Sequence, residues 1–174
     1  MTPALKSACL EALVAATGEV ASIVLAGSTC EPLEGDVASG HGAYLSLSTP
    51  EEPIQVAIIV GAQDCQLLAK ALLGLEGEDE DLPAGDVSDA MCEIINMIAG
   101  GLKRRVSGEL AVTLGLPMFV SGQPLPNQQQ EVSSRSLRVG DASVKLILIT
   151  QDQNVAPLSR RSSKLRAAAK EQSL

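Results

Sequence analysis

Aliphatic side chains must form nearly the whole hydrophobic core of this chain, because it is 45% hydrophobic but only 1% aromatic. Its 174 residues include one Tyr (Tyr44), one Phe (Phe119) and no Trp. A chain of this length usually folds around a single core. Binding modes that stack rings, such as single-stranded nucleic-acid binding and aromatic cages for cations, are therefore disfavoured.

The net charge of −8 also opposes binding to a phosphate backbone, so we expect no nucleic-acid partner. The charge is unevenly distributed along the chain. Residues 1–154 contain 8 Lys and Arg against 20 Asp and Glu, a balance of −12, whereas residues 155–174 contain 5 against 1, a balance of +4. We therefore expect one domain over residues 1–150 and a basic tail over residues 151–174 that is mobile.

Signals for secretion and membrane insertion are weak. Residues 3–16 form an amphipathic run that contains Glu11, which is unlike the apolar centre of a signal peptide. The longest aliphatic strings, Ile23–Ala26 and Val56–Val60, fall far short of the roughly 18 residues of a membrane span. The four cysteines form no C-x-x-C pair, which suits free thiols in a reducing compartment. We expect a cytoplasmic protein without a membrane span.

Hydrophobic periodicity predicts three helices and several strands. The helices cover residues 3–16 (ended by Gly18), the segment from Gly61 to Gly74, and residues 87–106 with Asp86 as N-cap. Strands or extended segments are expected over residues 20–25, 43–48, 54–60, 110–114, 117–121, 132–139 and 143–150, with a polar loop at 124–130. The predicted fold class is α+β, a mainly antiparallel sheet covered on one face by three helices.

Polar residues form a single stripe on the third predicted helix. At about 100° per residue, Glu93, Asn96 and Gly100 fall within roughly 40° of the line through Asp89. The opposite side of this helix is apolar and consists of Met91, Ile94, Ile95, Ile98 and Leu102. Burial of the apolar side against the sheet would point the stripe outward.

An outward Asn one turn from a Glu suits the orientation of a water molecule. The Asn amide both donates and accepts hydrogen bonds, so Asn96 can hold a water and aim its lone pair at an electrophile. Phosphoryl transfer depends mostly on positioning, and an uncharged amide that orients the attacking water is a recurring component. Glu93 can pair with a Lys beside a partner's phosphate. Gly100, which lacks a side chain, lets a partner's backbone approach.

The spacing Asp89-x₃-Glu93-x₂-Asn96, continued by Gly100, resembles the [Ser/Asp]-x₃-Glu-x₂-Asn signature of chemotaxis phosphatases of the CheC, CheX and FliY class. Residues 116–122, Leu-Pro-Met-Phe-Val-Ser-Gly, look like the Pro-x-Val-x-x-Gly strand that follows it. The resemblance covers residues 20–150. It is CheX-like, with a single signature, because the opening helix has Val14 three residues after Glu11, not an Asn.

The resemblance implies dephosphorylation of the aspartyl-phosphate of a CheY-like response regulator in chemotaxis or two-component signalling. Glu93 would contact the regulator's active-site Lys and Asn96 would position the water, with Asp89 and Gly100 in supporting or partner-binding positions. It implies that this chain binds no cofactor or metal of its own and that the required Mg²⁺ lies on the regulator. It also implies a homodimer formed by sheet or strand exchange.

Plainer interpretations of the stripe remain open. Asp89 could satisfy free backbone amides in the first turn, because Asp86 as N-cap would put it at the third helical position. Glu93 could be an ordinary surface acid. Asn96 has a poor helix propensity in mid-helix, which makes a purely structural role less favoured for it. Gly100 weakens the helix by about 1 kcal/mol relative to Ala. Close approach of a partner or of the sheet is therefore the favoured reason for that glycine.

The alternative function is a non-catalytic scaffold of the same fold that binds a receiver domain. A third hypothesis is that the basic tail recruits the protein to an acidic surface. The single histidine, His41, is flanked by Gly40 and Gly42 and is expected in a loop. With this single histidine in a loop, neither a Ser-His-Asp triad nor a His-rich metal site is predicted.

Overall fold

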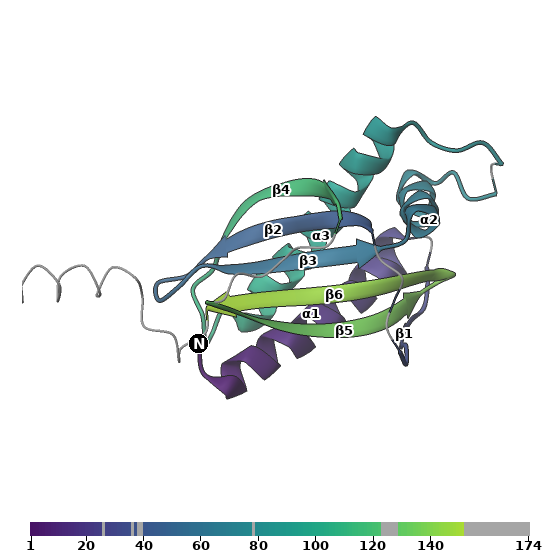
Figure 1. Cartoon of the computed structure of the whole chain (residues 1–174). Helices are drawn as coiled ribbons and strands as arrows, with labels where there is room; N and C mark the ends of the chain where they lie inside the picture. Colours follow the sequence, from purple (N-terminus) through teal and green to yellow (C-terminus); the bar gives the residue numbers. More distant parts are fainter. Residues whose placement is uncertain (26, 36, 38–39, 78, 123–128, 152–174) are drawn as a thin grey trace, which may run out of the picture.

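The computed structural model describes residues 1–25, 27–35, 37, 40–77, 79–122 and 129–151. Six strands form one antiparallel sheet in the order β1-β5-β6-β3-β2-β4, and three helices cover one of its faces (Figure 1). The elements are α1 (Pro3–Val24), β1 (Cys30–Pro32), β2 (His41–Ser48), β3 (Ile54–Val60), α2 (Ala62–Leu73), α3 (Ala84–Val106), β4 (Thr113–Ser121), β5 (Gln130–Val139) and β6 (Ala142–Gln151). This architecture confirms the predicted fold class.

Two hairpins form the centre of the sheet, as the strand patterns predict. In the first, β2 pairs with β3 from His41 opposite Val60 to Leu47 opposite Ile54. In the second, β5 pairs with β6 along their whole length, and the turn between them has Gly140 at φ +57°, a backbone angle that favours glycine. β3 then pairs with β6, which joins the two hairpins into one sheet.

The main core lies between the sheet and the helices and is aliphatic. Its largest fully buried side chains come from both layers, for example Leu45 on β2, Leu146 on β6, Leu13 on α1 and Ile98 on α3. A smaller cluster lies on the opposite face of the sheet, the helix-free face, which none of the described helices covers. Ala57 and Ile59 of β3 and Ile147 and Ile149 of β6 are buried there. β3 and β6 are therefore apolar on both faces, as expected for the central strands of a sheet.

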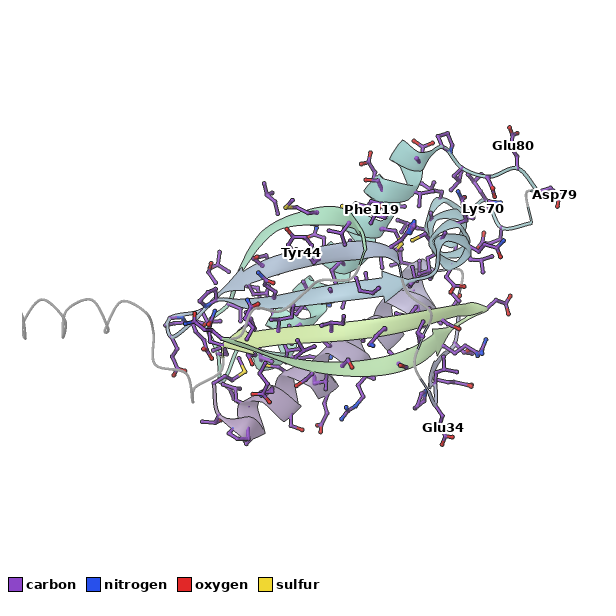
Figure 2. The ribbon with its side chains drawn as sticks, viewed as in Figure 1. Glu34, Tyr44, Lys70, Asp79, Glu80 and Phe119 are labelled. Atoms are coloured by element: carbon purple, nitrogen blue, oxygen red, sulfur yellow. The ribbon has the colours of Figure 1, made fainter. Side chains whose placement is uncertain are left out.

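The two aromatic residues lie on neighbouring strands but belong to different clusters. Tyr44 on β2 packs against the helix-free cluster, whereas Phe119 on β4 packs against the main core (Figure 2). The Tyr44 hydroxyl donates to the sulfur of Met118 on β4, at 3.2 Å. β4 is an edge strand of the sheet, and it leaves Met118 54% and Leu116 86% exposed.

The predicted strand over residues 20–25 is wrong, because α1 continues through Gly18 to Val24. Val20 and Ala21 extend the buried side of the helix, which begins at Cys9 and Leu10. Their burial outweighs the weak helix propensity of Gly and of β-branched residues, which amounts to about 1 kcal/mol or less per residue. A Cβ at Gly18 would meet Cys30 only at ordinary contact distance, 3.8 Å, so nothing forces the helix to end there.

Other differences from the sequence prediction are smaller. The short strand β1 was not predicted, and the extended segment predicted at 110–114 only partly coincides with β4, which starts at Thr113 and includes the predicted segment 117–121. His41 is the first residue of β2 and not a loop residue. Most of the polar loop predicted at 124–130 and nearly all of the basic tail lie outside the described residues, so the division at residue 150 stays a prediction.

The helix α1 is long and apolar enough, by length and composition alone, to cross a membrane. Core helices of globular domains meet the same criterion. Seven of its side chains are buried, and it contacts α3, β5, β1 and β6. We therefore interpret α1 as a core helix.

Candidate functional site

The helix α3 carries the predicted site and lies between α1 and α2, over β2 and β4. Its last turn contains Lys103, Arg104 and Arg105, whose positive charges complement the negative end of the helix dipole. Arg104 and Arg105 also reach α1, where both contact Glu19 Oε2, at 3.3 Å and 3.0 Å. The hydrogen bond and charge of Arg105 hold the pKa of the Glu19 carboxyl below its ordinary value. Glu19, which the sequence patterns did not single out, thus ties α1 to α3.

The polar stripe faces outward, as the helical wheel predicts. All five apolar residues of the opposite side are 0% exposed: Met91, Ile94, Ile95, Ile98 and Leu102. On the stripe, Asp89 and Glu93 are exposed, whereas Asn96 and Gly100 are half-buried. Asn96 is therefore more enclosed by its neighbours than the two acidic residues are.

The N-terminus of α3 differs from the prediction in a way that affects Asp89. The helix begins at Ala84 with Pro83 as N-cap, and the Val87 amide donates to the Pro83 carbonyl at 3.1 Å. Asp86 lies in the first turn and is not the cap, so Asp89 is the sixth helical residue and not the third. Free backbone amides occur only in the first turn. A capping role therefore does not explain Asp89.

The side chains of Glu93 and Asn96 have no hydrogen-bond or ion-pair partner within the part of the chain that the structure describes. The basic residues of α3 begin at Lys103, ten residues or about 15 Å along the helix from Glu93, which is too far for an ion pair. A carboxylate and an amide, three residues apart on one face of a helix, are thus both available to an external partner.

Two consecutive glycines in α3 have different surroundings. A Cβ at Gly101 would lie 2.7 Å from the Ala16 Cβ, which is closer than two side chains can pack. Gly101 therefore allows α1 and α3 to approach each other. A Cβ at Gly100 would meet no atom within 4 Å. Packing within the chain explains Gly101 but leaves Gly100 without an internal reason.

Cys92 flanks the stripe on the side that faces β4. Burial raises the pKa of its thiol, the charge of Asp89 raises it further, and a hydrogen bond with the Phe119 backbone lowers it in part. All four cysteines are free, with Cys9 and Cys65 buried and Cys30 and Cys92 half-buried. Burial and the charge of Asp64 raise the pKa of Cys65 to about 11. Thiolate nucleophiles need a lowered pKa, so Cys65 and Cys92 are not arranged as nucleophiles.

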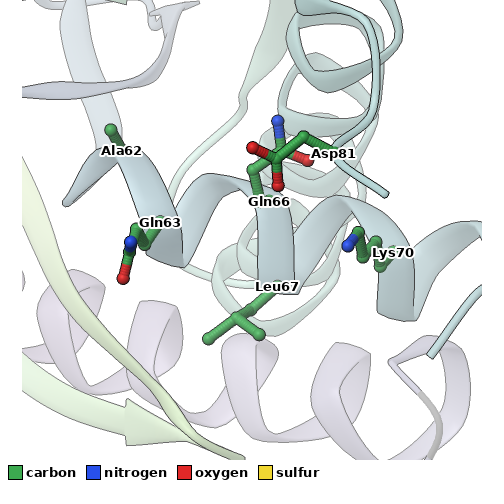
Figure 3. A pocket seen from close by; sticks show the side chains of 6 residues that line it. All are labelled: Ala62, Gln63, Gln66, Leu67, Lys70 and Asp81. Atoms are coloured by element: carbon green, nitrogen blue, oxygen red, sulfur yellow. The ribbon is translucent and has the colours of Figure 1, made fainter. Parts of the chain in front are cut away.

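Other candidate sites either lie apart from the stripe or are not found among the described residues. A pocket of about 360 Å³ beside α2 is lined by residues that include Gln63, Gln66, Leu67 and Asp81, and by no stripe residue (Figure 3). Gln66 is held there by two hydrogen bonds with the Leu82 backbone. In the described ranges, no group of three or more His, Cys, Asp and Glu side chains could hold a metal ion.

His41 does not form a catalytic arrangement with its neighbours. Its ring lies edge-on to Phe119, with centroids 6.5 Å apart, and its buried Nδ1 has no hydrogen-bond partner among the described residues. The stripe on α3 therefore stays the candidate site among the described residues.

Comparison with protein families supports the same region. The family model described as chemotaxis phosphatase CheX matches residues 46–137, which contain the whole stripe. Comparison with curated proteins finds no match.

Several solved structures share the fold. A chemotaxis protein CheX from Desulfovibrio desulfuricans is 19% identical, with a TM-score of 0.66 over 80% of this chain and 97% of its own. The CheX protein of Vibrio vulnificus is 15% identical, with a TM-score of 0.68 over 80% and 94%. A complex of CheX, CheY, BeF₃ and Mg²⁺ from Borrelia burgdorferi contains a chain that is 18% identical, with a TM-score of 0.65 over 80% and 95%.

Proposed function

The chain belongs to the chemotaxis phosphatase CheX family, and we propose that it hydrolyses the aspartyl-phosphate of a CheY-like response regulator. The observation that carries the proposal is the stripe on α3, where Glu93 and Asn96 lie at the surface without a partner among the described residues. A solved relative forms a complex with CheY, BeF₃ and Mg²⁺, which supports a CheY-like partner for this chain.

In the proposed mechanism Asn96 orients the attacking water. Its amide holds the water by hydrogen bonding and directs an oxygen lone pair at the phosphorus. The water oxygen forms a bond to phosphorus while the bond from phosphorus to the aspartyl oxygen breaks. The aspartate leaves as a carboxylate, and the protons of the water pass to the phosphate product and to solvent. No residue of this chain has to act as a general base.

Glu93 has a positioning role in this proposal. Its carboxylate would pair with the regulator's active-site Lys and so hold the Asn96 amide in line with the phosphoryl group. Asp89 and Gly100 would support this contact, the first by its charge and the second by admitting the partner's backbone. Mg²⁺ would be bound by the regulator, where it would neutralise charge on the phosphoryl oxygens.

The test is phosphate release from a panel of phosphorylated receiver domains with Mg²⁺. Addition of the protein should accelerate release, and Asn96→Ala should lower kcat about a hundredfold or more while binding is retained. Equal rates with and without the Asn96 amide would contradict the mechanism. Binding that ignores phosphorylation, without turnover, would favour the alternative of a non-catalytic receiver-binding scaffold.

We also propose that the protein acts in the cytoplasm, as a homodimer. The exposed Leu116 and Met118 on the edge strand β4 support association through this edge, since an open edge offers both unpaired backbone groups and apolar surface. Sedimentation analysis should give the mass of a dimer, and Leu116→Ser should shift it toward the monomer. A wild-type monomer at all concentrations would contradict the dimer.

A further inference from the structure

A groove of about 310 Å³ lies between α1 and α3, beside the polar stripe. Its walls come from the last turns of α1, with Val20, Ile23 and Val24, and from α3, with Met97 and Gly100. Gly100 belongs to both the groove and the stripe. The two features therefore form one continuous surface.

The groove is open, and apart from Glu19 and Arg104 its lining residues are aliphatic, methionine or glycine. Val20 is buried at 8% exposure, and Val24 and Met97 are half-buried, whereas Ile23 beside them is 75% exposed. A single exposed Ile is ordinary on a protein surface. Here, however, it stands at an open apolar groove, where a partner's side chain could cover it and gain the free energy of burying an aliphatic residue.

The charges around this surface are arranged in order along α3. Asp89 and Glu93 lie on one side of Asn96, and Arg104, with a side chain 69% exposed, lies at the groove. At about 1.5 Å rise per residue, Glu93 and Arg104 are about 16 Å apart. Glu19 also lines the groove and contacts both Arg104 and Arg105, so two cations share one carboxylate there. A complementary partner presents a cation near the stripe, a carboxylate near this cluster and an apolar side chain between them.

A protein interface of typical size, centred on the stripe, is large enough to cover the groove as well. A specific interface covers about 800 Å² on each partner, which corresponds to a disc of roughly 16 Å radius. Arg104 lies about 12 Å along the helix from Asn96. A receiver domain that is centred over Asn96 therefore extends over the groove.

We propose that this groove is the docking site for the response regulator, an inference that rests on the function proposed above. An apolar side chain of the regulator enters between Ile23 and Met97, and a neighbouring carboxylate of the regulator shares Arg104 with Glu19. Asn96 orients the water that attacks the phosphorylated aspartate, and Glu93 pairs with the regulator's Lys beside it. The groove determines which receiver binds.

The experiment measures phosphate release against the concentration of phosphorylated receiver for two variants and two matched controls. Ile23→Ser is compared with Leu73→Ser, because Leu73 is a 49% exposed apolar residue on α2. Arg104→Gln is compared with Arg138→Gln, because Arg138 alternates with the buried Leu137 of β5 and so lies on the helix-free face.

We expect Ile23→Ser to raise KM about tenfold with kcat unchanged, on the scale of one lost aliphatic contact. Arg104→Gln should raise KM severalfold at low salt and weaken its dependence on salt, because a screened ion pair is lost. Both controls should behave as wild type. Thermal unfolding of all four variants verifies that they are folded.

The outcomes separate the docking site from the proposed function. If wild type releases phosphate and Asn96→Ala does not, but Ile23→Ser has the KM of Leu73→Ser, the groove is not the docking site and the function stands. A lowered kcat at unchanged KM for Ile23→Ser would also overturn docking. If the wild-type protein accelerates phosphate release from none of the receivers, both the proposed function and the groove proposal are wrong.

Discussion

The helices α1 and α3 are nearly equal in length, 22 and 23 residues, and contact each other on the same face of the sheet. Residues 7–18 of α1 repeat the spacing of the stripe at residues 89–100 of α3. The matched positions are Ser7, Glu11, Val14 and Gly18 in α1 and Asp89, Glu93, Asn96 and Gly100 in α3. In both helices the first two positions are exposed and the last two are half-buried. The two stripes therefore match more closely in the exposure of their residues than in the chemistry of their side chains.

The difference between the stripes is concentrated at one position. Val14 occupies the place of the Asn96 amide, and its side chain packs against the main core. Ser7 replaces an acid and donates its hydroxyl to Glu11 at 3.4 Å. A valine can neither hold nor orient a water. The comparison teaches that spacing and exposure alone do not make the proposed site, and that α1 serves as an internal control for α3.

The largest difference between the helices is expected for the two glutamates. Glu93→Gln should lower kcat/KM at least tenfold, because the regulator's Lys would lose a charged partner at the interface. Glu11→Gln should leave kcat/KM within twofold of wild type. Steady-state phosphate release measures both, and equal losses would mean that the two stripes are functionally equivalent.

The two glycines of α3 test how it contacts α1 and a partner. Gly101→Ala should lower the free energy of unfolding by about 1–3 kcal/mol, because its Cβ would overlap with Ala16. Gly100→Ala should raise that free energy by up to about 1 kcal/mol, because Ala favours the helix and meets no atom. It should nevertheless slow phosphate release. Urea unfolding measures the stability of both variants, and phosphate release measures their activity. Full activity of Gly100→Ala would contradict a role of Gly100 in partner approach.

An Asn placed on α1 tests whether the four-residue spacing is sufficient for phosphatase activity. In the Asn96→Ala background, Val14→Asn should restore little, leaving kcat within about threefold of the single variant, because the groove flanks only the stripe of α3. Phosphate release by the double variant measures this. Recovery to near wild-type rates would show that the groove is unnecessary and that the four-residue spacing suffices.

The smallest expected change concerns one cysteine from each helix. A bound receiver should slow alkylation of the half-buried Cys92 severalfold and leave the buried Cys9 unchanged. The pKa of both thiols is raised, chiefly by burial, so the thiolate fraction is small at neutral pH. Alkylation of Cys92 should therefore rise about tenfold per pH unit while the pH remains below that pKa. Peptide mapping would contradict this if the receiver protected both cysteines equally.

The orientation of the α3 stripe could be predicted from the sequence, because the apolar side of the helix has only one way to be buried. The end of α1 could not be predicted in the same way. Gly18 and the β-branched run after it favour a helix stop and a strand locally, and burial against the sheet and α3 overrides both. The groove could therefore not be predicted from the sequence either, because Ile23 lies in the part of α1 that local propensity assigns to a strand.

The pairing of Tyr44 with Met118 has an optical consequence. The chain has no Trp, and Tyr44 is its only Tyr, so nearly all of its intrinsic ultraviolet emission comes from one site at the junction of β2 and β4. Any Trp on a binding partner would be observed against a dark background. Loss or recovery of Tyr44 emission would in turn report on the edge of the sheet, separately from the helix face that carries the stripe.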